Sequence, residues 1–162
     1  MVPIWIDYFL VLAIHDRQLA EHGGAEGVRD EVLLESALAR PQQMLAYAEP
    51  EPDLAELAAS LAHGLARKHP FVDGNKRTAA VVCETFIELN GARLDAEDAE
   101  LFPRFLALAD GRLSAPDFAA WLRGRLRTQR VQEEAPRYRA KAAVKPARRA
   151  ARAASPAPGR GG

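Results

Sequence analysis

Residues 75–89 constrain the fold more than any other segment, because as a helix they are apolar on almost every side. Residues 79–83 are five small or apolar residues in a row, and only a narrow polar strip that includes Glu84 and Glu88 interrupts the pattern. A helix that is apolar nearly all round must be enclosed by other elements. We therefore expect residues 75–89 to form a buried central helix, which Asn90 and Gly91 terminate.

Helical spacing of apolar residues, together with capping signals, predicts five further helices around this one. The expected helices cover residues 5–22, 31–39, 54–68, 97–109 and 115–126. Phe9 and Leu12 belong to the expected apolar face of the first helix, and Pro41 is expected to lie just past the end of the second. No run of alternating residues predicts a sheet, so the sequence indicates an all-α bundle.

Charge divides the chain into two parts. Residues 1–126 hold 12 Lys and Arg against 20 Asp and Glu, whereas residues 127–162 hold 10 against 2. The second part consists largely of Ala, Arg, Pro and Gly, a composition typical of disorder. We expect a folded domain over residues 1–126 and a disordered basic tail over residues 127–162. The tail is interpreted either as a linker without a specific partner or as a weak, nonspecific nucleic-acid-binding segment.

The single cysteine, Cys83, lies in an apolar run and is interpreted as a buried hydrophobic residue. One cysteine cannot form a disulfide within the chain, which fits a reducing compartment. The apolar run of residues 4–14 is too short to span a bilayer, which needs about 20 residues. We therefore expect a cytoplasmic protein with no membrane segment.

The segment of residues 69–77, HPFVDGNKR, contains the densest group of reactive side chains in the sequence. Pro70 is incompatible with continuing the helix over residues 54–68, and Gly74 permits a sharp turn before the next helix. The first N–H groups of a helix lack intrahelical partners, and the helix dipole is positive at that end. The free N–H groups and the positive end of the dipole therefore make this junction a candidate anion-binding site.

The side chains of this segment indicate phosphate chemistry. Lys76 and Arg77 stand in the first helical turn, where the helix dipole disfavours cations unless a polyanion lies between them. Asp73 would repel a bare phosphate and is expected to hold Mg²⁺. An imidazole titrates close to neutral pH, so His69 can serve as a general base. Phe71 is expected to point into the core and anchor the loop.

A plainer interpretation is that the segment is a helix boundary with incidental charges and a histidine satisfied by the core. The complete ordered set of a base, a metal ligand and a phosphate cradle argues against it. The set is not a Walker A loop, because the sequence holds no G-x-x-x-x-G-K-[ST] pattern. The remaining histidines, His15, His22 and His63, lack the spacing of a metal site and are interpreted as structural or surface residues.

With these residues in place, the chain resembles the Fic/Doc family, and within it the Doc toxins. The family signature is H-x-F-x-[DE]-[AG]-N followed by Lys-Arg in Doc proteins, and residues 69–77 match it at every defined position. The segments AIHD at residues 13–16, GVRD at 27–30 and LLESAL at 33–38 resemble the same proteins. The resemblance covers about residues 5–125 and implies an all-α Fic/Doc helical bundle.

The resemblance also implies a role for each residue of the signature. His69 corresponds to the base that activates a target hydroxyl, and Asp73 to the Mg²⁺ ligand. Gly74 and Asn75 correspond to the turn that cradles an anion, and Arg77 to the phosphate clamp.

Two departures from the AMP-transferring Fic proteins are informative. Lys76 replaces their glycine, and Ala80 stands where they usually carry a second arginine. In Doc-like proteins these features accompany transfer of the γ-phosphate of ATP to a Ser or Thr hydroxyl. The resemblance implies that the target is of the elongation factor Tu type, that translation and growth would be arrested, and that the regulator is a Phd-type antitoxin.

Two alternatives remain open from the sequence. The first is a Fic-type nucleotidyl transferase that moves AMP or UMP onto a protein hydroxyl. The second is a binding module without catalytic activity, whose basic tail carries the function.

Overall fold

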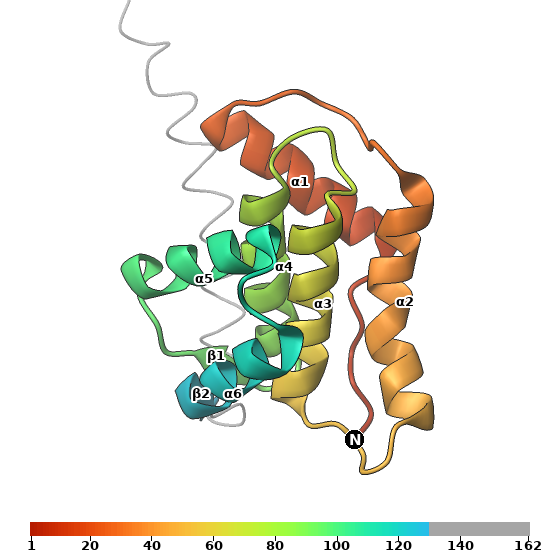
Figure 1. Cartoon of the computed structure of the whole chain (residues 1–162), viewed down its shortest axis with the longest axis vertical. Helices are drawn as coiled ribbons and strands as arrows, with labels where there is room; N and C mark the ends of the chain where they lie inside the picture. Colours follow the sequence, from red (N-terminus) through yellow and green to blue (C-terminus); the bar gives the residue numbers. More distant parts are fainter. Residues whose placement is uncertain (130–162) are drawn as a thin grey trace, which may run out of the picture. The chain divides into compact units, whose positions relative to one another are not determined.

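The computed structural model describes residues 1–129, which form six helices and two short strands. In chain order the elements are α1 (Tyr8–His22), α2 (Glu31–Tyr47), α3 (Leu54–Lys68), α4 (Asn75–Leu89), β1 (Ala92–Leu94), α5 (Asp98–Asp110), α6 (Ala115–Arg125) and β2 (Leu126–Thr128). Helices make up most of this part (Figure 1), which confirms the predicted all-α class. The expectations for the basic tail concern residues 130–162 almost entirely, and these lie outside the described residues.

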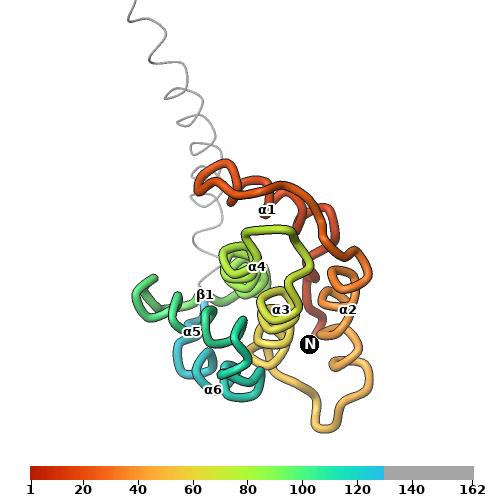
Figure 2. Tube along the Cα trace, turned by 45° about the horizontal axis from the view of Figure 1, so that its top comes forward, coloured from red at the N-terminus to blue at the C-terminus, as the bar shows by residue number. Residues whose placement is uncertain are grey.

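Helices α3 and α4 form the centre of the described part. Figure 2 shows them side by side, with α1, α2, α5 and α6 placed around them. The inward residues of α4 are Thr78, Ala79, Ala80, Val82, Cys83, Phe86 and Ile87, all of them buried. The expected buried central helix is therefore confirmed, because α4 packs against α1, α3 and α5.

The burial of Cys83 is complete, and it raises the pKa of the thiol far above its ordinary range. The side chain therefore stays protonated and behaves as a small hydrophobic residue, as expected. Among residues 1–129, no helix is long and apolar enough to cross a membrane.

Side-chain caps explain why α3 and α6 begin where the sequence predicts. The carboxylate of Asp53 accepts a hydrogen bond from the Glu56 N–H at 2.9 Å, and the Glu56 side chain accepts one from the Asp53 N–H. This reciprocal pair satisfies two otherwise unpaired donors at the start of α3. At the start of α6 the Ser114 hydroxyl accepts a single hydrogen bond from the Asp117 N–H at 3.2 Å. Arg123 then joins the two helices, because its Nε lies 2.6 Å from Oδ2 of Asp53.

The apolar face predicted for the first helix is confirmed only in part: Leu12 is partly buried and packs against the core, whereas Phe9 does not. The carboxylate of Asp7 caps α1 through the Leu10 N–H at 2.8 Å, so the helix begins at Tyr8 rather than at residue 5. Phe9 is 77% exposed. The buried positions of α1 are instead Val11, His15 and Gln18. The inward face includes polar side chains, which a search for apolar periodicity does not detect.

The predicted end of the second helix is also wrong, because α2 continues through Pro41 to Tyr47. A proline inside a helix removes one backbone hydrogen bond and crowds the preceding turn, at a cost of about 3 kcal/mol. Pro41 is buried, and the partly buried Met44 and Leu45 pack against the core beyond it. The burial of these apolar side chains offsets the lost hydrogen bond.

A small antiparallel sheet joins β1 to β2, although no sheet was expected. Its register pairs Ala92 with Thr128 and Leu94 with Leu126. Strands of three residues are too short for alternation to be recognised in a sequence. The strand β2 carries regular structure two residues beyond position 126, the expected end of the domain.

Candidate active site

The motif loop, which we define as residues 69–74, connects the end of α3 to the start of α4 (Figure 1). His69 is the C-terminal cap of α3 and has left-handed backbone angles, with φ 53° and ψ 58°. A residue other than glycine adopts this conformation only where its surroundings hold it there. His69 is the one residue other than glycine with positive φ within residues 1–129.

Arg29 holds His69 in this conformation. Its Nε donates to the His69 carbonyl at 2.7 Å, and its Nη2 donates to the Lys68 carbonyl at 2.8 Å. These are two of the carbonyls that a helix leaves unpaired at its C-terminus, where a cation is also favoured by the helix dipole. The candidate base is therefore oriented by a residue from a distant part of the sequence.

The backbone of the α1–α2 connection also pairs with the motif loop. The Pro70 carbonyl accepts from the N–H groups of Arg29 and Asp30 at 2.7 and 3.0 Å, and the Val72 N–H donates to the Gly27 carbonyl at 3.0 Å. These bonds bracket an isolated antiparallel bridge between Val28 and Phe71. The motif loop is therefore fixed along one edge before any ligand binds.

Phe71 and His15 fix the loop from the side of the core. Phe71 is 1% exposed, and its ring stacks on the His15 ring at a centroid distance of 3.8 Å. The Nε2–H of His15 donates to the backbone carbonyl of Asp73 at 2.8 Å. His15 is therefore a buried structural residue that supports the loop, a more specific role than the sequence indicated.

The Asn75 side chain closes the loop onto itself. Its Oδ1 accepts from the Phe71 N–H at 2.9 Å, and its Nδ2 donates to the Phe71 carbonyl at 3.0 Å. Both the oxygen and the nitrogen of the Asn75 amide are therefore paired with the backbone of Phe71. Asn75 was predicted to cradle an anion, and with its side chain engaged in this way it can do so only through its backbone N–H.

The carboxylate of Asp73 is exposed and held by two backbone donors. The Ala25 N–H donates to Oδ2 at 3.2 Å, and the Gly74 N–H donates to Oδ1 at 2.9 Å. These bonds, the Ala25 bond first, lower the pKa of Asp73, and the charges of Arg77 and Lys76 lower it further. The group is therefore an anion at neutral pH, with lone pairs left for a cation.

The start of α4 offers the anion site that the sequence predicted. Its N-terminal cap is Gly74, whose φ of 77° suits glycine, and no side chain caps the first turn. The first helical N–H groups therefore remain available. Lys76 and Arg77 are both exposed in this turn, close enough to Asp73 to affect its titration.

The residues present fit Mg²⁺ bound together with phosphates better than a metal held by protein alone. Within residues 1–129, no group of three or more His, Cys, Asp or Glu side chains could hold a metal ion. Mg²⁺ typically takes one or two carboxylates and completes its shell with phosphate oxygens and water. Asp73 beside an open helix N-terminus matches that pattern.

Two supporting residues, Arg29 and His15, were not assigned these roles from the sequence. Both lie inside segments that resemble Doc proteins, GVRD and AIHD, so the resemblance contained the signal. His15 also follows the buried Val11 by one helical turn, which places it on the inward face of α1.

The sequence is similar to those of known proteins. The sequence profile of the Fic/DOC family matches residues 5–87. The toxin Doc of Mycolicibacterium smegmatis is 47% identical over 75 residues, which are 46% of this chain and 58% of that protein. The protein kinase doc of Escherichia phage P1 is 34% identical over 113 residues, which are 70% of this chain and 88% of the phage protein.

The alignment spans less than two thirds of the mycobacterial toxin but nearly all of the phage protein. The residues that the family profile matches include His69 and the residues that fix its loop, Arg29 and His15. Because the profile, the relatives and the signature agree, the chain belongs to the Fic/Doc family.

Proposed function

We propose that this protein transfers the γ-phosphate of ATP to a Ser or Thr hydroxyl of a translation protein of the elongation factor Tu type. The observation that carries the proposal is the open N-terminus of α4. Lys76 and Arg77 are exposed there, beside the ionised carboxylate of Asp73. This arrangement can bind a polyphosphate and its metal together.

Each group has a distinct task in this reaction. His69 accepts the proton of the target hydroxyl, whose oxygen forms a bond to the γ-phosphorus while the bond to the β-phosphate oxygen breaks and ADP leaves. Arg77, Lys76 and the N–H groups of α4 hold the phosphate oxygens. Mg²⁺ held by Asp73 would neutralise charge on those oxygens. Asn75 and Phe71 keep the loop in shape.

Phosphate transfer is favoured over AMP transfer at two positions. Lys76 places a second cation in the turn where the AMP-transferring Fic proteins have glycine. Ala80, where those proteins carry a second arginine, is 5% exposed and packs in the core. The described site therefore offers one guanidinium from α4 rather than two. The phage relative is named a protein kinase, which agrees with this choice.

The relatives also bear on regulation. One of them is named a toxin, and we extend that role to this chain: unrestrained transfer would arrest translation and growth in the cytoplasm. A protein of this kind requires a neutralising partner, and we propose a Phd-type antitoxin.

The test uses ATP labelled at either end, with Mg²⁺ and purified elongation factor Tu. Label from the γ-position on the target supports phosphate transfer. Label from the α-position instead would establish AMP transfer.

The matched variants are His69→Ala and His22→Ala, the second an exposed histidine at the end of α1. His69→Ala should reduce labelling by about 10²–10⁴-fold, the usual contribution of a general base. His22→Ala should label at the parental rate. If His69→Ala retains full toxicity in cells, the function is not catalysis by His69, and a binding role replaces it.

A further inference from the structure

Asn90, the residue that ends α4, ties the segment before α1 to the central helix. Its Oδ1 accepts a hydrogen bond from the Ile4 N–H at 2.7 Å, and its Nδ2 donates to the Ile4 carbonyl at 3.0 Å. The same Nδ2 donates to the Phe86 carbonyl at 2.8 Å. Both N–H donors of the amide are therefore in use. We call these three hydrogen bonds the Asn90 anchor.

Packing supports the Asn90 anchor from the side of the leading segment. The Trp5 ring stacks on the Phe86 ring at a centroid distance of 5.7 Å, and Ile6 is buried. The Ile4 side chain is 55% exposed, so residue 4 contributes mainly through its backbone. The anchor can therefore be weakened by removing one backbone N–H, with little change in side-chain packing.

Asn90 precedes Gly91, and an asparagine in this position is chemically labile in a flexible chain. The Gly91 nitrogen loses its proton to solvent and attacks Cγ of Asn90. A C–N bond forms, and the amide nitrogen takes up a proton and leaves as ammonia. Water then opens the cyclic imide at either carbonyl, which gives aspartate or isoaspartate. Glycine favours the attack because it has no Cβ to hinder its nitrogen.

The chain contains its own comparison for this reaction. Its sequence has two asparagines, and the second, Asn75, is followed by Lys76. The lysine side chain hinders the approach that Gly91 permits. Asn90 is therefore the more labile of the two asparagines by sequence alone.

The folded structure keeps both reacting groups of Asn90 and Gly91 engaged. The Gly91 N–H donates to the Glu88 carbonyl at 3.2 Å, within the turn that ends α4. The amide nitrogen, which is the leaving group, is bound to the carbonyls of Ile4 and Phe86. Attack on Cγ requires the side chain to rotate, and rotation breaks these bonds. Local opening of the Asn90 anchor is therefore the step that permits the reaction.

We propose that Asn90 is a deamidation site that reacts only when the Asn90 anchor opens, and that the reaction prevents the anchor from forming again. The carboxylate of either product has no N–H to donate, so it would face the carbonyls of Ile4 and Phe86 as an unpaired anion. A reversible opening thus becomes a lasting release of residues 4–6 from α4.

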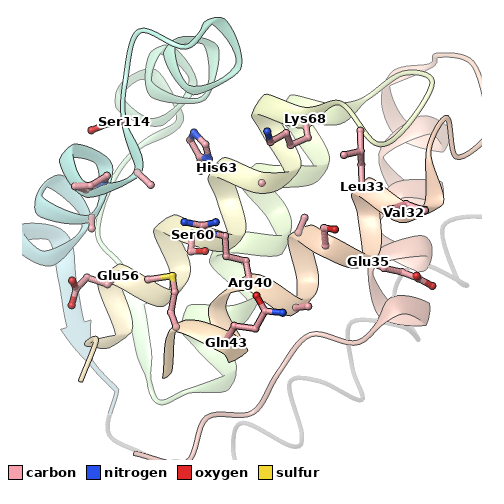
Figure 3. A pocket seen from close by; sticks show the side chains of 18 residues that line it. Val32, Leu33, Glu35, Arg40, Gln43, Glu56, Ser60, His63, Lys68 and Ser114 are labelled. Atoms are coloured by element: carbon pink, nitrogen blue, oxygen red, sulfur yellow. The ribbon is translucent and has the colours of Figure 1, made fainter. Parts of the chain in front are cut away.

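This inference does not depend on the transfer reaction. Asn90 lies at the opposite end of α4 from Lys76 and Arg77. It is also separate from the groove bounded by α2, α3 and the start of α6 (Figure 3), whose volume is about 920 Å³. Neither Asn90 nor any of residues 1–7 lines that groove, so an occupant of the groove would not cover the Asn90 amide directly.

The experiment ages the full chain at mildly alkaline pH, with and without denaturant, and follows deamidation by mass spectrometry of tryptic peptides. Trypsin cleaves after Lys and Arg, so Asn90 falls in the peptide of residues 78–93 and Asn75 in that of residues 69–76. Neither peptide contains glutamine, so each mass increase is assigned to one asparagine. An unaged sample gives the starting value.

The parent should deamidate at Asn90 slowly when folded and much faster in denaturant, where Asn75 should react far more slowly. Ile4→Pro removes the N–H that donates to Oδ1 and should speed the reaction of the folded protein about fivefold, the effect of losing one hydrogen bond. The matched control is Ile4→Ala, which keeps that N–H and changes only an exposed side chain. It should react at the parental rate.

Asn90→Asp reproduces one product and tests the second half of the proposal. Hydrogen exchange of the backbone amides of residues 5 and 6 should become faster in this variant than in the parent. Adding Ile4→Pro to Asn90→Asp should raise the exchange rate no further, because both changes break the same contact.

Three results would overturn the proposal. Equal rates in Ile4→Pro and Ile4→Ala would show that the hydrogen bond from Ile4 does not control the reaction. Equal deamidation of the folded and the denatured parent would show that the fold gives no protection. Unchanged hydrogen exchange in Asn90→Asp would show that the anchor forms around the carboxylate. If Ile4→Pro does not fold, Trp5→Leu, which removes the stack on Phe86, takes its place and should also speed the reaction.

Discussion

The Nε2–H of His15 donates a 2.8 Å hydrogen bond to the backbone carbonyl of Asp73, 58 residues further along the chain. This bond links α1 to the residue that we propose as the Mg²⁺ ligand. Because the His15 ring also stacks on Phe71, one buried side chain supports the motif loop at two points.

Replacing His15 with Ala should therefore impair both the fold and the site. We expect a loss of about 1–3 kcal/mol in the free energy of unfolding, since the Asp73 carbonyl loses its partner. His15→Gln retains an N–H donor and should keep more activity than His15→Ala. His15→Leu fills the space without a donor, so equal activity of the Gln and Leu variants would mean that only the volume of the side chain matters. Denaturant unfolding and the Mg²⁺ dependence of labelling measure the two effects, with His22→Ala as the control.

Two adjacent glycines test the placement of the Asp73 carboxylate. A Cβ atom at Gly24 would lie 3.0 Å from Oδ2 of Asp73, whereas one at Gly23 would meet nothing within 4 Å. Both residues have positive φ, at 128° and 82°, so Ala is strained at either position. Gly24→Ala should raise the Mg²⁺ concentration needed for activity, and Gly23→Ala should not. Equal effects of the two variants on Mg²⁺ dependence would show that backbone strain alone is responsible.

Asn75 should matter for loop structure more than for direct ligand contact. Asn75→Asp keeps the acceptor for the Phe71 N–H but replaces the donor to the Phe71 carbonyl with an anionic oxygen. We expect a loss of about 1–3 kcal/mol in the free energy of unfolding, together with loss of activity. Thermal unfolding monitored by circular dichroism measures the first effect. Unchanged stability of the Asn75→Asp variant would contradict the structural role.

Glu84 should make stability depend on pH. Burial, followed by the charges of Glu88 and Asp98, raises the pKa of this half-buried carboxyl above its ordinary value. Between the unfolded and the folded pKa the folded state binds more protons, so stability falls as pH rises through that interval. At pH values above the folded-state pKa, the full cost of holding the charged Glu84 carboxylate in a half-buried position remains. Glu84→Gln should therefore stabilise the protein at neutral pH.

The advantage of Glu84→Gln should disappear below about pH 4, where the carboxyl is protonated in both states. Thermal unfolding at a series of pH values tests this, with the exposed Glu35→Gln as the matched control. A stabilisation that persists unchanged in acid would mean that the charge of Glu84 is not its cause.

The parts of the fold that the sequence predicted well are those governed by local signals. The bounds of α3 and α4 agree with expectation, because Asp53 caps one helix and Gly74 begins the other. The predicted start of α1 and the predicted end of α2 were wrong. At Pro41 the packing of a whole helix overrode a local penalty, and such packing is not visible in a short window of sequence.

The same distinction holds for the candidate site. The proposed base, metal ligand and phosphate-binding residues are contiguous in residues 69–77, so one segment of sequence contains them all. The contacts from His15 and Arg29 cross 58 and 40 residues, and a pattern search along the chain does not pair such positions. The role of Asn75 was also missed in part, because its spacing to Phe71 is local but its hydrogen bonds depend on the bend of the loop.

The pairing of Arg29 with the last carbonyls of α3 has a thermodynamic consequence. The guanidinium joins the end of α3 to the residue just before the Asp30 cap of α2, so the conformational entropy of the motif loop is lost during folding. Fixing one residue of backbone costs about 1–2 kcal/mol. Because the loop is already ordered, substrate binding does not have to supply this free energy for each loop residue. His69, the proposed proton acceptor, is therefore preorganised.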